Sequence, residues 1–208
     1  MKEQLQKDFD NIIKNLSLSQ RDTEIKQFYL DNFINKGFPN RRDENWKFSD
    51  LNQIIKKNIG ELSFYNDYTS TNKVDTSIFV DGLEHNKIVF INGRIEKIDF
   101  DYEKKDQIEI IDQSETINKF NNNNSLSDLN NAFTNKSFKI IVKNGYQLVK
   151  PLIIYHITNS DIWSKNINLR LDFELGKDSS LRLIDLYNDT SEKNFLNIFY
   201  NFDLKKNA

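Results

Sequence analysis

The sequence contains no cysteine among its 208 residues. Disulfide bonds, thiolate nucleophiles, cysteine-ligated zinc and cysteine-ligated iron–sulfur clusters are therefore excluded within this polypeptide. A chain without cysteine suits a reducing compartment, and we expect a cytoplasmic protein. Histidine is also scarce: His85 and His156 are the two present, and their positions match no paired metal-ligand motif. The sequence thus predicts no metal site and no bound cofactor.

Long hydrophobic runs are missing as well. The longest apolar run, Leu152 to Tyr155, is far shorter than the ~18 residues of a membrane-spanning helix. The first residues are charged where a signal peptide would need an apolar core. The net charge of -2 leaves no broad basic surface, so neither a membrane nor a nucleic acid is an expected partner. Gly93 and Gly145 are isolated, and the absence of a phosphate-binding glycine motif excludes ATPase activity in this chain.

Residues 1–65 predict a small helical region. Apolar residues recur there at helical spacing in three stretches: Leu5, Phe9, Ile12, Ile13 and Leu16; Ile25, Phe28, Tyr29 and Phe33; Leu51, Ile54 and Ile55. Ser19, with Asp22 three positions later, predicts the start of the second helix as a capping box. Ser49 or Asp50 can cap the third helix, which we expect to end near Gly60.

The segment from Gly37 to Leu51, called the strap below, joins two of these helices. Gly37 can close a helix in the left-handed conformation, and Pro39 prevents its continuation. We expect the strap to be extended and ordered, held by four apolar anchors: Phe38, Trp46, Phe48 and Leu51. Its charged residues from 41 to 44 can pair with one another or with a partner.

Residues 66–134 predict a mixed region. A polar linker at 66–77 precedes two short strand-like runs, at 87–91 and 94–98, joined by Asn92-Gly93, the strongest hairpin signal in the chain. Another strand is expected at 107–111, and a short helix at 126–133 with Ser125 or Ser127 as its cap.

Residues 135–208 are almost all strand-like. Five runs, at 138–142, 151–157, 167–175, 181–187 and 196–204, are separated by turns such as Asn144-Gly145 and Gly176 to Asp178. This spacing fits a sandwich, a barrel or a β-solenoid, and no fixed-period repeat selects the last. The final run stops close to residue 208, which predicts an unpaired edge: either the protein is incomplete or this strand pairs with another chain.

No combination of residues forms a credible catalytic site, so we expect a protein that is not an enzyme. His156 is interpreted as a strand histidine that faces solvent or is hydrogen-bonded in the sheet; a ligand role would need carboxylates from neighbouring strands or another subunit. The acidic pairs Asp99 with Asp101 and Asp185 with Asp189 are interpreted as exposed carboxylates. Four aromatic residues near the end could belong to the core or to an interface: Phe195, Phe199, Tyr200 and Phe202.

The strap has a second property, which is its pattern of residue types. It resembles the N-terminal signature of the SufD family of iron–sulfur cluster assembly proteins. The residues that carry this resemblance are Gly37, Pro39, Arg41, Glu44, Trp46, Lys47 and Leu51. Two further segments are similar to family motifs: the hairpin with Asn92 and Gly93, and the segment with Leu129, Asn130, Ala132 and Phe133. The segments from Lys150 to Ile154 and from Asn168 to Leu181 add weaker similarity.

The resemblance implies an α+β protein, with the N-terminal helical region leading into a right-handed parallel β-helix that starts near residue 135 and is apparently truncated. It implies a non-catalytic scaffold that works with a SufB-like paralogue and a SufC-like ATPase. An iron–sulfur cluster would be handled by that complex and not bound by this chain alone. The segments that bind the partners in this family would lie beyond residue 208. The alternative is a β-helical carbohydrate-binding or carbohydrate-active protein, which would need Asp, Arg or Lys clustered on one face.

Overall fold

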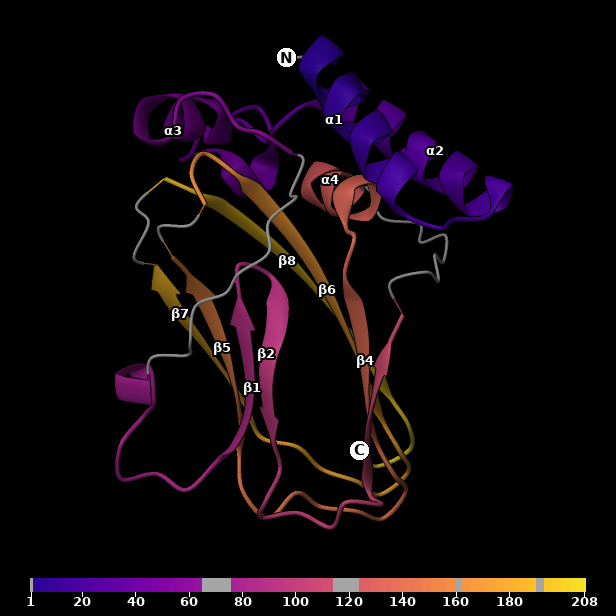
Figure 1. Ribbon diagram of the computed structural model, residues 1–208, viewed down its shortest axis with the longest axis vertical. Helices are drawn as coiled ribbons and strands as arrows, with labels where there is room; N and C mark the ends of the chain where they lie inside the picture. Colours follow the sequence, from indigo (N-terminus) through magenta and orange to yellow (C-terminus); the bar gives the residue numbers. More distant parts are fainter. Residues whose placement is uncertain (1, 65–75, 114–123, 160–161, 190–192) are drawn as a thin grey trace.

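A computed structural model describes residues 2–64, 76–113, 124–159, 162–189 and 193–208. The chain has an α+β fold in which N-terminal helices are followed by two mixed four-stranded sheets (Figure 1). The helices lie together over one end of the strands, and the connections at residues 143–151 and 176–182 lie at the other end. The predicted linker at 66–77 falls almost entirely outside the described residues.

Two helices open the chain: α1 (Lys2–Asn15) and α2 (Gln20–Lys36). The Ser19 hydroxyl accepts the Asp22 amide at the start of α2, and Gly37, with φ of 72°, ends it as predicted. The predicted apolar stripe of α2 is wrong at Phe28, which is 43% exposed. Lys26 and Leu30 are buried on the core-facing side instead.

The strap is ordered but not extended throughout, because a short 3-10 helix, η1 (Glu44–Trp46), interrupts it. Phe38 and Leu51 are buried anchors, and Trp46 packs at the margin of the same core. The prediction that Phe48 is an anchor is wrong, since this residue is 85% exposed. Its ring contacts the ammonium group of the neighbouring Lys47, which lies 4.9 Å from the ring centroid. Asp50 caps α3 (Leu51–Asn58) by accepting the Gln53 amide, which decides between the two predicted caps.

The hairpin prediction is confirmed. Strand β1 (Asn86–Ile91) pairs antiparallel with β2 (Arg94–Asp99), and both Asn92 and Gly93 have positive φ, as a tight two-residue turn requires. A short 3-10 helix, η2 (Thr76–Ile78), precedes it, and β3 (Ile108–Asp112) follows. Helix α4 (Ser125–Phe133) is capped by Asn124, so the expected caps Ser125 and Ser127 are wrong.

The remaining strands are β4 (Ser137–Val142), β5 (Leu152–Thr158), β6 (Asn166–Leu175), β7 (Leu183–Asp189) and β8 (Phe195–Leu204). The first sheet has the order β2-β1-β5-β7 and the second the order β3-β4-β6-β8. In each sheet the last three strands are parallel and the first is antiparallel. From β4 to β8 the chain therefore crosses from one sheet to the other at every step.

The two sheets enclose one apolar core. Alternate residues of each strand point inward, so that Ile88, Ile154, Ile140 and Phe173 lie in the same buried cluster. This burial explains the strict alternation of the sequence in β6, where inward Leu169 and Leu171 are fully covered. A separate core holds the helices together and includes Phe9, Leu30 and Phe133.

Helix α4 joins the helical core to the second sheet. The Lys26 ammonium group is buried under it and donates to the backbone carbonyls of Asn131, Ala132 and Thr134. Burial lowers the pKa of Lys26 to about 7. On its other side α4 contacts the sheet, because the Asn130 amide donates to the carbonyls of Leu169 and Asn197. These buried polar contacts fix the orientation of α4.

Candidate functional site

Strand β7 is an edge strand of the first sheet, and β8 is an edge strand of the second. We call these two strands the open end. Their edges carry mostly apolar and aromatic residues. Several of those residues are more than a third exposed, namely Ile184, Tyr187, Phe202 and Leu204. Parallel strands with exposed apolar edges are templates for pairing with another strand.

A polar cluster lies between the sheets at the open end. It consists of His156 on β5, Asp185 and Tyr187 on β7, and Tyr200 on β8, and we call it the inner cluster. His156 Nε2 lies 3.0 Å from Asp185 Oδ1 and 3.0 Å from the Tyr200 hydroxyl. The Tyr200 hydroxyl lies 2.7 Å from each Asp185 oxygen, and the Tyr187 hydroxyl donates to Asp185 Oδ2 at 2.7 Å.

Strand register explains why these side chains meet. His156 is paired with Tyr187 and, on its other side, with Phe90, so three rings form a continuous stack across the first sheet. Asp185 is paired with the inward-facing Ile154, and therefore also points inward. Tyr200 points inward from the opposite sheet and stacks on Phe173. The cluster thus spans both sheets.

Hydrogen bonding controls the charges in the inner cluster. Burial opposes ionisation of Asp185, but hydrogen bonds from His156, Tyr187 and Tyr200 outweigh it and hold its pKa below the ordinary value. Burial, and then the hydrogen bond to Asp185, raise the pKa of both Tyr187 and Tyr200. The cluster therefore presents one carboxylate to two neutral phenols and an imidazole.

The inner cluster departs from the sequence expectations in part. Asp185 was expected to be exposed, yet only 26% of its side chain is accessible to solvent. The side chain of His156 is almost completely buried, with 2% accessible. His156 is hydrogen-bonded within the sheet, as one of the two predicted alternatives has it. The cluster itself was missed. The sequence does contain one indication of it. Asp185 occupies a position in an alternating strand that faces the core, where an apolar residue is expected.

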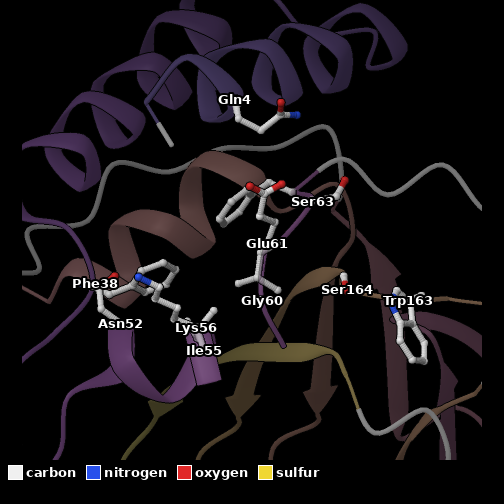
Figure 2. A pocket seen from close by; sticks show the side chains of 12 residues that line it. Gln4, Phe38, Asn52, Ile55, Lys56, Gly60, Glu61, Ser63, Trp163 and Ser164 are labelled. Carbon is white, nitrogen blue, oxygen red and sulfur yellow. The ribbon is translucent and has the colours of Figure 1, made fainter. Parts of the chain in front are cut away.

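A cavity of about 920 Å³ lies where α1, α3 and the start of β6 meet (Figure 2). Its walls include the apolar Phe38, Ile55 and Leu62, while Lys56 and Glu61 supply opposite charges. Trp163 lies at one side of it and is 59% exposed. The side chains that line it are of mixed character, and they include no histidine and no aspartate. Lys56 and Glu61 are the charged side chains among the described residues that line it.

The residues that carry the family resemblance lie in two places. Gly37, Pro39, Glu44 and Trp46 of the strap line a hollow of about 540 Å³ that Asn124 and Ser125, at the start of α4, complete. Leu51, Leu129, Ala132 and Phe133 lie in the helical core beside them, while Arg41 and Lys47 are exposed. Asn92 and Gly93 form the hairpin turn of the first sheet. Most of the signature is therefore structural.

No similarity to a known protein assigns a role to these residues. The chain matches no known family model, and no curated protein sequence is detectably similar to it. Among the described residues, no three or more His, Cys, Asp or Glu side chains lie together as metal ligands. None of the helices in that part of the chain has both the length and the hydrophobicity needed to cross a bilayer.

Proposed function

We propose that this chain is a non-catalytic scaffold component of an iron–sulfur cluster assembly system, similar to SufD, and acts with a SufB-like paralogue and a SufC-like ATPase. The observation that carries the proposal is the path of the chain from β4 to β8. Strands alternate between two sheets, and each pairs in parallel with the strand two positions earlier. That path is the one expected for the beginning of the β-helix that the resemblance implies.

The pairing supports a β-helix in its details. Phe138 pairs with Leu171, and Leu171 in turn pairs with Tyr200. Each coil is thus roughly 30 residues long, within the range of known solenoid repeats. Side chains also stack from coil to coil, as in the ring stack of Phe90, His156 and Tyr187. Ladders of equivalent side chains of this kind are typical of stacked coils.

A scaffold needs surfaces for other proteins, and the open end offers one. The edges of β7 and β8 can each accept a further parallel or antiparallel strand. We propose that the open end pairs with strands of the same assembly, which would cover Ile184, Phe202 and Leu204. Nucleotide hydrolysis in the assembly would come from the ATPase partner, since no phosphate-binding glycine motif is present.

Co-purification tests this proposal. The complete gene product, carrying an affinity tag, should be co-expressed with the SufB-like and SufC-like proteins of the same genome. We expect all three to elute together from size-exclusion chromatography in one complex. If the complete product folds but retains neither partner, the assignment to this assembly system is wrong.

A further inference from the structure

We propose that the cavity lined by Phe38, Ile55, Leu62 and Lys56 binds a small amphiphile, namely an aliphatic carboxylate of medium chain length. The cavity takes no part in the proposed scaffold role, so this site is independent of any partner protein. Three features point to this ligand: the size and position of the cavity, its fixed apolar walls, and the charges at its margin.

The cavity has the size and the position of a small-molecule site. Its volume of about 920 Å³ lies within the range of roughly 300 to 1,000 Å³ that is usual for such sites. It lies between α1, α3 and the loop that leads into β6, where the helical core meets the end of the sheets (Figure 2). Ligand sites often lie at such junctions between separately packed parts of a chain.

The apolar walls are held in place by contacts within the chain. The Phe38 ring packs edge-on against Phe33, with the ring centroids 5.1 Å apart. Phe64 lies on the wall beside it, with its ring 5.1 Å from that of Phe133 and its backbone N–H donating to Asp8 Oδ2 at 2.7 Å. A preformed apolar wall can cover an aliphatic chain without the entropy cost of ordering the site. A sugar, which carries hydroxyl groups around its ring, would leave these walls unmatched.

Lys56 is the group that can hold a carboxylate. Lys56 and Glu61 both line the cavity and are exposed, and neither has a hydrogen bond or an ion pair within the part of the chain that the structure describes. The figure places Lys56 and Trp163 on either side of Gly60 (Figure 2). An ammonium group at the margin of an apolar recess matches a ligand with a charged head and an apolar chain.

The surrounding charges favour an anionic head group over a cationic one. Lys165 Nζ donates to the hydroxyl of Ser63, a lining residue, at 3.2 Å. Lys193 Nζ lies 4.7 Å from the ring centroid of Trp163, which also lines the cavity. With Lys56 these groups make three ammonium groups around the cavity. The carboxylates are Glu61 and the buried Asp8, and Asp8 already accepts the amides of Phe64 and Gln4.

Titration of the 208-residue chain with sodium octanoate, followed by calorimetry, tests the site. We expect one equivalent to bind. In the series hexanoate, octanoate and decanoate, each added methylene group should tighten binding about threefold to fourfold, because it is removed from water. Octylammonium has the same chain and the opposite charge, and should bind at least about tenfold more weakly than octanoate.

Tryptophan fluorescence locates the bound ligand. Trp46 and Trp163 are the two tryptophans of the chain, so Trp46→Phe leaves Trp163 as the reporter. Trp163 is 59% exposed, and its emission should move to shorter wavelength when the aliphatic chain covers it.

The matched variants are Lys56→Met and Lys57→Met. Both lysines are exposed in the last turn of α3, but Lys56 lines the cavity and Lys57 does not. Lys56→Met should weaken octanoate binding about fivefold or more and leave the binding of octanol within about twofold, because only the charged contact is lost. Lys57→Met should change neither. Thermal unfolding of each variant checks that it is folded.

Four results would overturn the proposal. They are no binding of octanoate by the unchanged chain, equal affinity for octylammonium and octanoate, equal losses from the two lysine variants, and an affinity that does not depend on chain length. Failure of the chain to retain SufB-like or SufC-like proteins would leave the octanoate result intact.

Discussion

The two ends of the sheet stack differ in how they present their edges. One end is formed by β2 and β3, which are antiparallel to their neighbours and carry charged residues such as Glu96, Lys97 and Glu109. The open end, β7 and β8, is parallel to the strands before it and carries leucine, isoleucine, tyrosine and phenylalanine. Charged edge residues prevent further strand pairing, whereas apolar edges favour it.

This difference shows that the two sheets are terminated at one end and left half covered at the other. At the β2 and β3 end the antiparallel strands turn the chain back and terminate both sheets. At the open end the core continues outward through Phe202, Tyr187 and the inner cluster, so its last layer is only half covered. A layer left half covered gains most from an added strand, because burying apolar area stabilises in proportion to the area removed from water.

The largest expected effect comes from one row of stacked side chains. Phe173 is buried and pairs with Phe202, whose ring lies 5.1 Å away and is 48% exposed. Phe173→Ala should lower the free energy of unfolding by about 3–5 kcal/mol, because it leaves a cavity in the core. Phe202→Ala should lower it by only about 1 kcal/mol, since half of that ring is already in water. Urea denaturation measures both.

Partner binding would sharpen this first contrast. If the open end pairs with another strand, Phe202→Ala should lower the free energy of unfolding more in the complex than in the isolated chain. Equal losses of about 3–5 kcal/mol for both variants in the isolated chain would contradict the distinction between a covered and a half-covered layer.

A smaller contrast separates two aspartates at opposite ends. Asp185 accepts hydrogen bonds from three side chains at 2.7 to 3.0 Å, while Asp99 on β2 lies farther from its partners, at 3.4 Å from Lys87 and 3.5 Å from Lys97. Asp185→Asn should cost about 2 kcal/mol of unfolding free energy, because a buried acceptor of charged hydrogen bonds is lost. Asp99→Asn should cost at most about 1 kcal/mol, because its two lysine partners lie at the long limit of hydrogen-bond distance and contribute less.

Acid should reveal the same difference. The pKa of Asp185 is lower in the folded than in the unfolded chain, so its contribution to stability is complete above about pH 4 and is lost as the pH falls further. Stability curves of the unchanged chain and of Asp185→Asn should therefore converge below that pH. Curves that stay parallel down to pH 2 would show that ionised Asp185 does not stabilise the fold.

How far the sequence predicts this structure depends on whether local spacing decides the outcome. Asn92-Gly93 predicts the hairpin because a two-residue turn needs two positive φ values. The alternation in β6 predicts a strand with one buried face. The apolar face is buried as expected, but Asn166, Asn168 and Arg170 on the other face are buried as well. The choice among sandwich, barrel and solenoid depends on which distant strands pair, and periodicity carries no information about that.

The inner cluster could not be predicted for a related reason. His156, Asp185 and Tyr200 are far apart in the chain and meet only through parallel register across two sheets. Lys26 is similar, since helical spacing predicts a surface lysine, whereas the carbonyls that hold it belong to a helix 105 or more residues away. Phe48 shows the opposite error: an apolar type predicts burial, and the 3-10 helix of the strap turns it outward.

The smallest effect on stability is expected from charges placed on the two edges of the first sheet. Ile184 on β7 is 38% exposed and Ile98 on β2 is 47% exposed, so each can be replaced by lysine at a cost of about 0.5–1 kcal/mol. Their effects on assembly should differ. Ile184→Lys places a charge at the open end and should reduce capture of the proposed partners at least about tenfold, because an edge lysine opposes strand pairing. Ile98→Lys alters an edge that is already charged, and capture should be unchanged. Pull-down yields at matched protein concentration measure both, and equal loss from the two variants would mean that the open end has no special role in assembly.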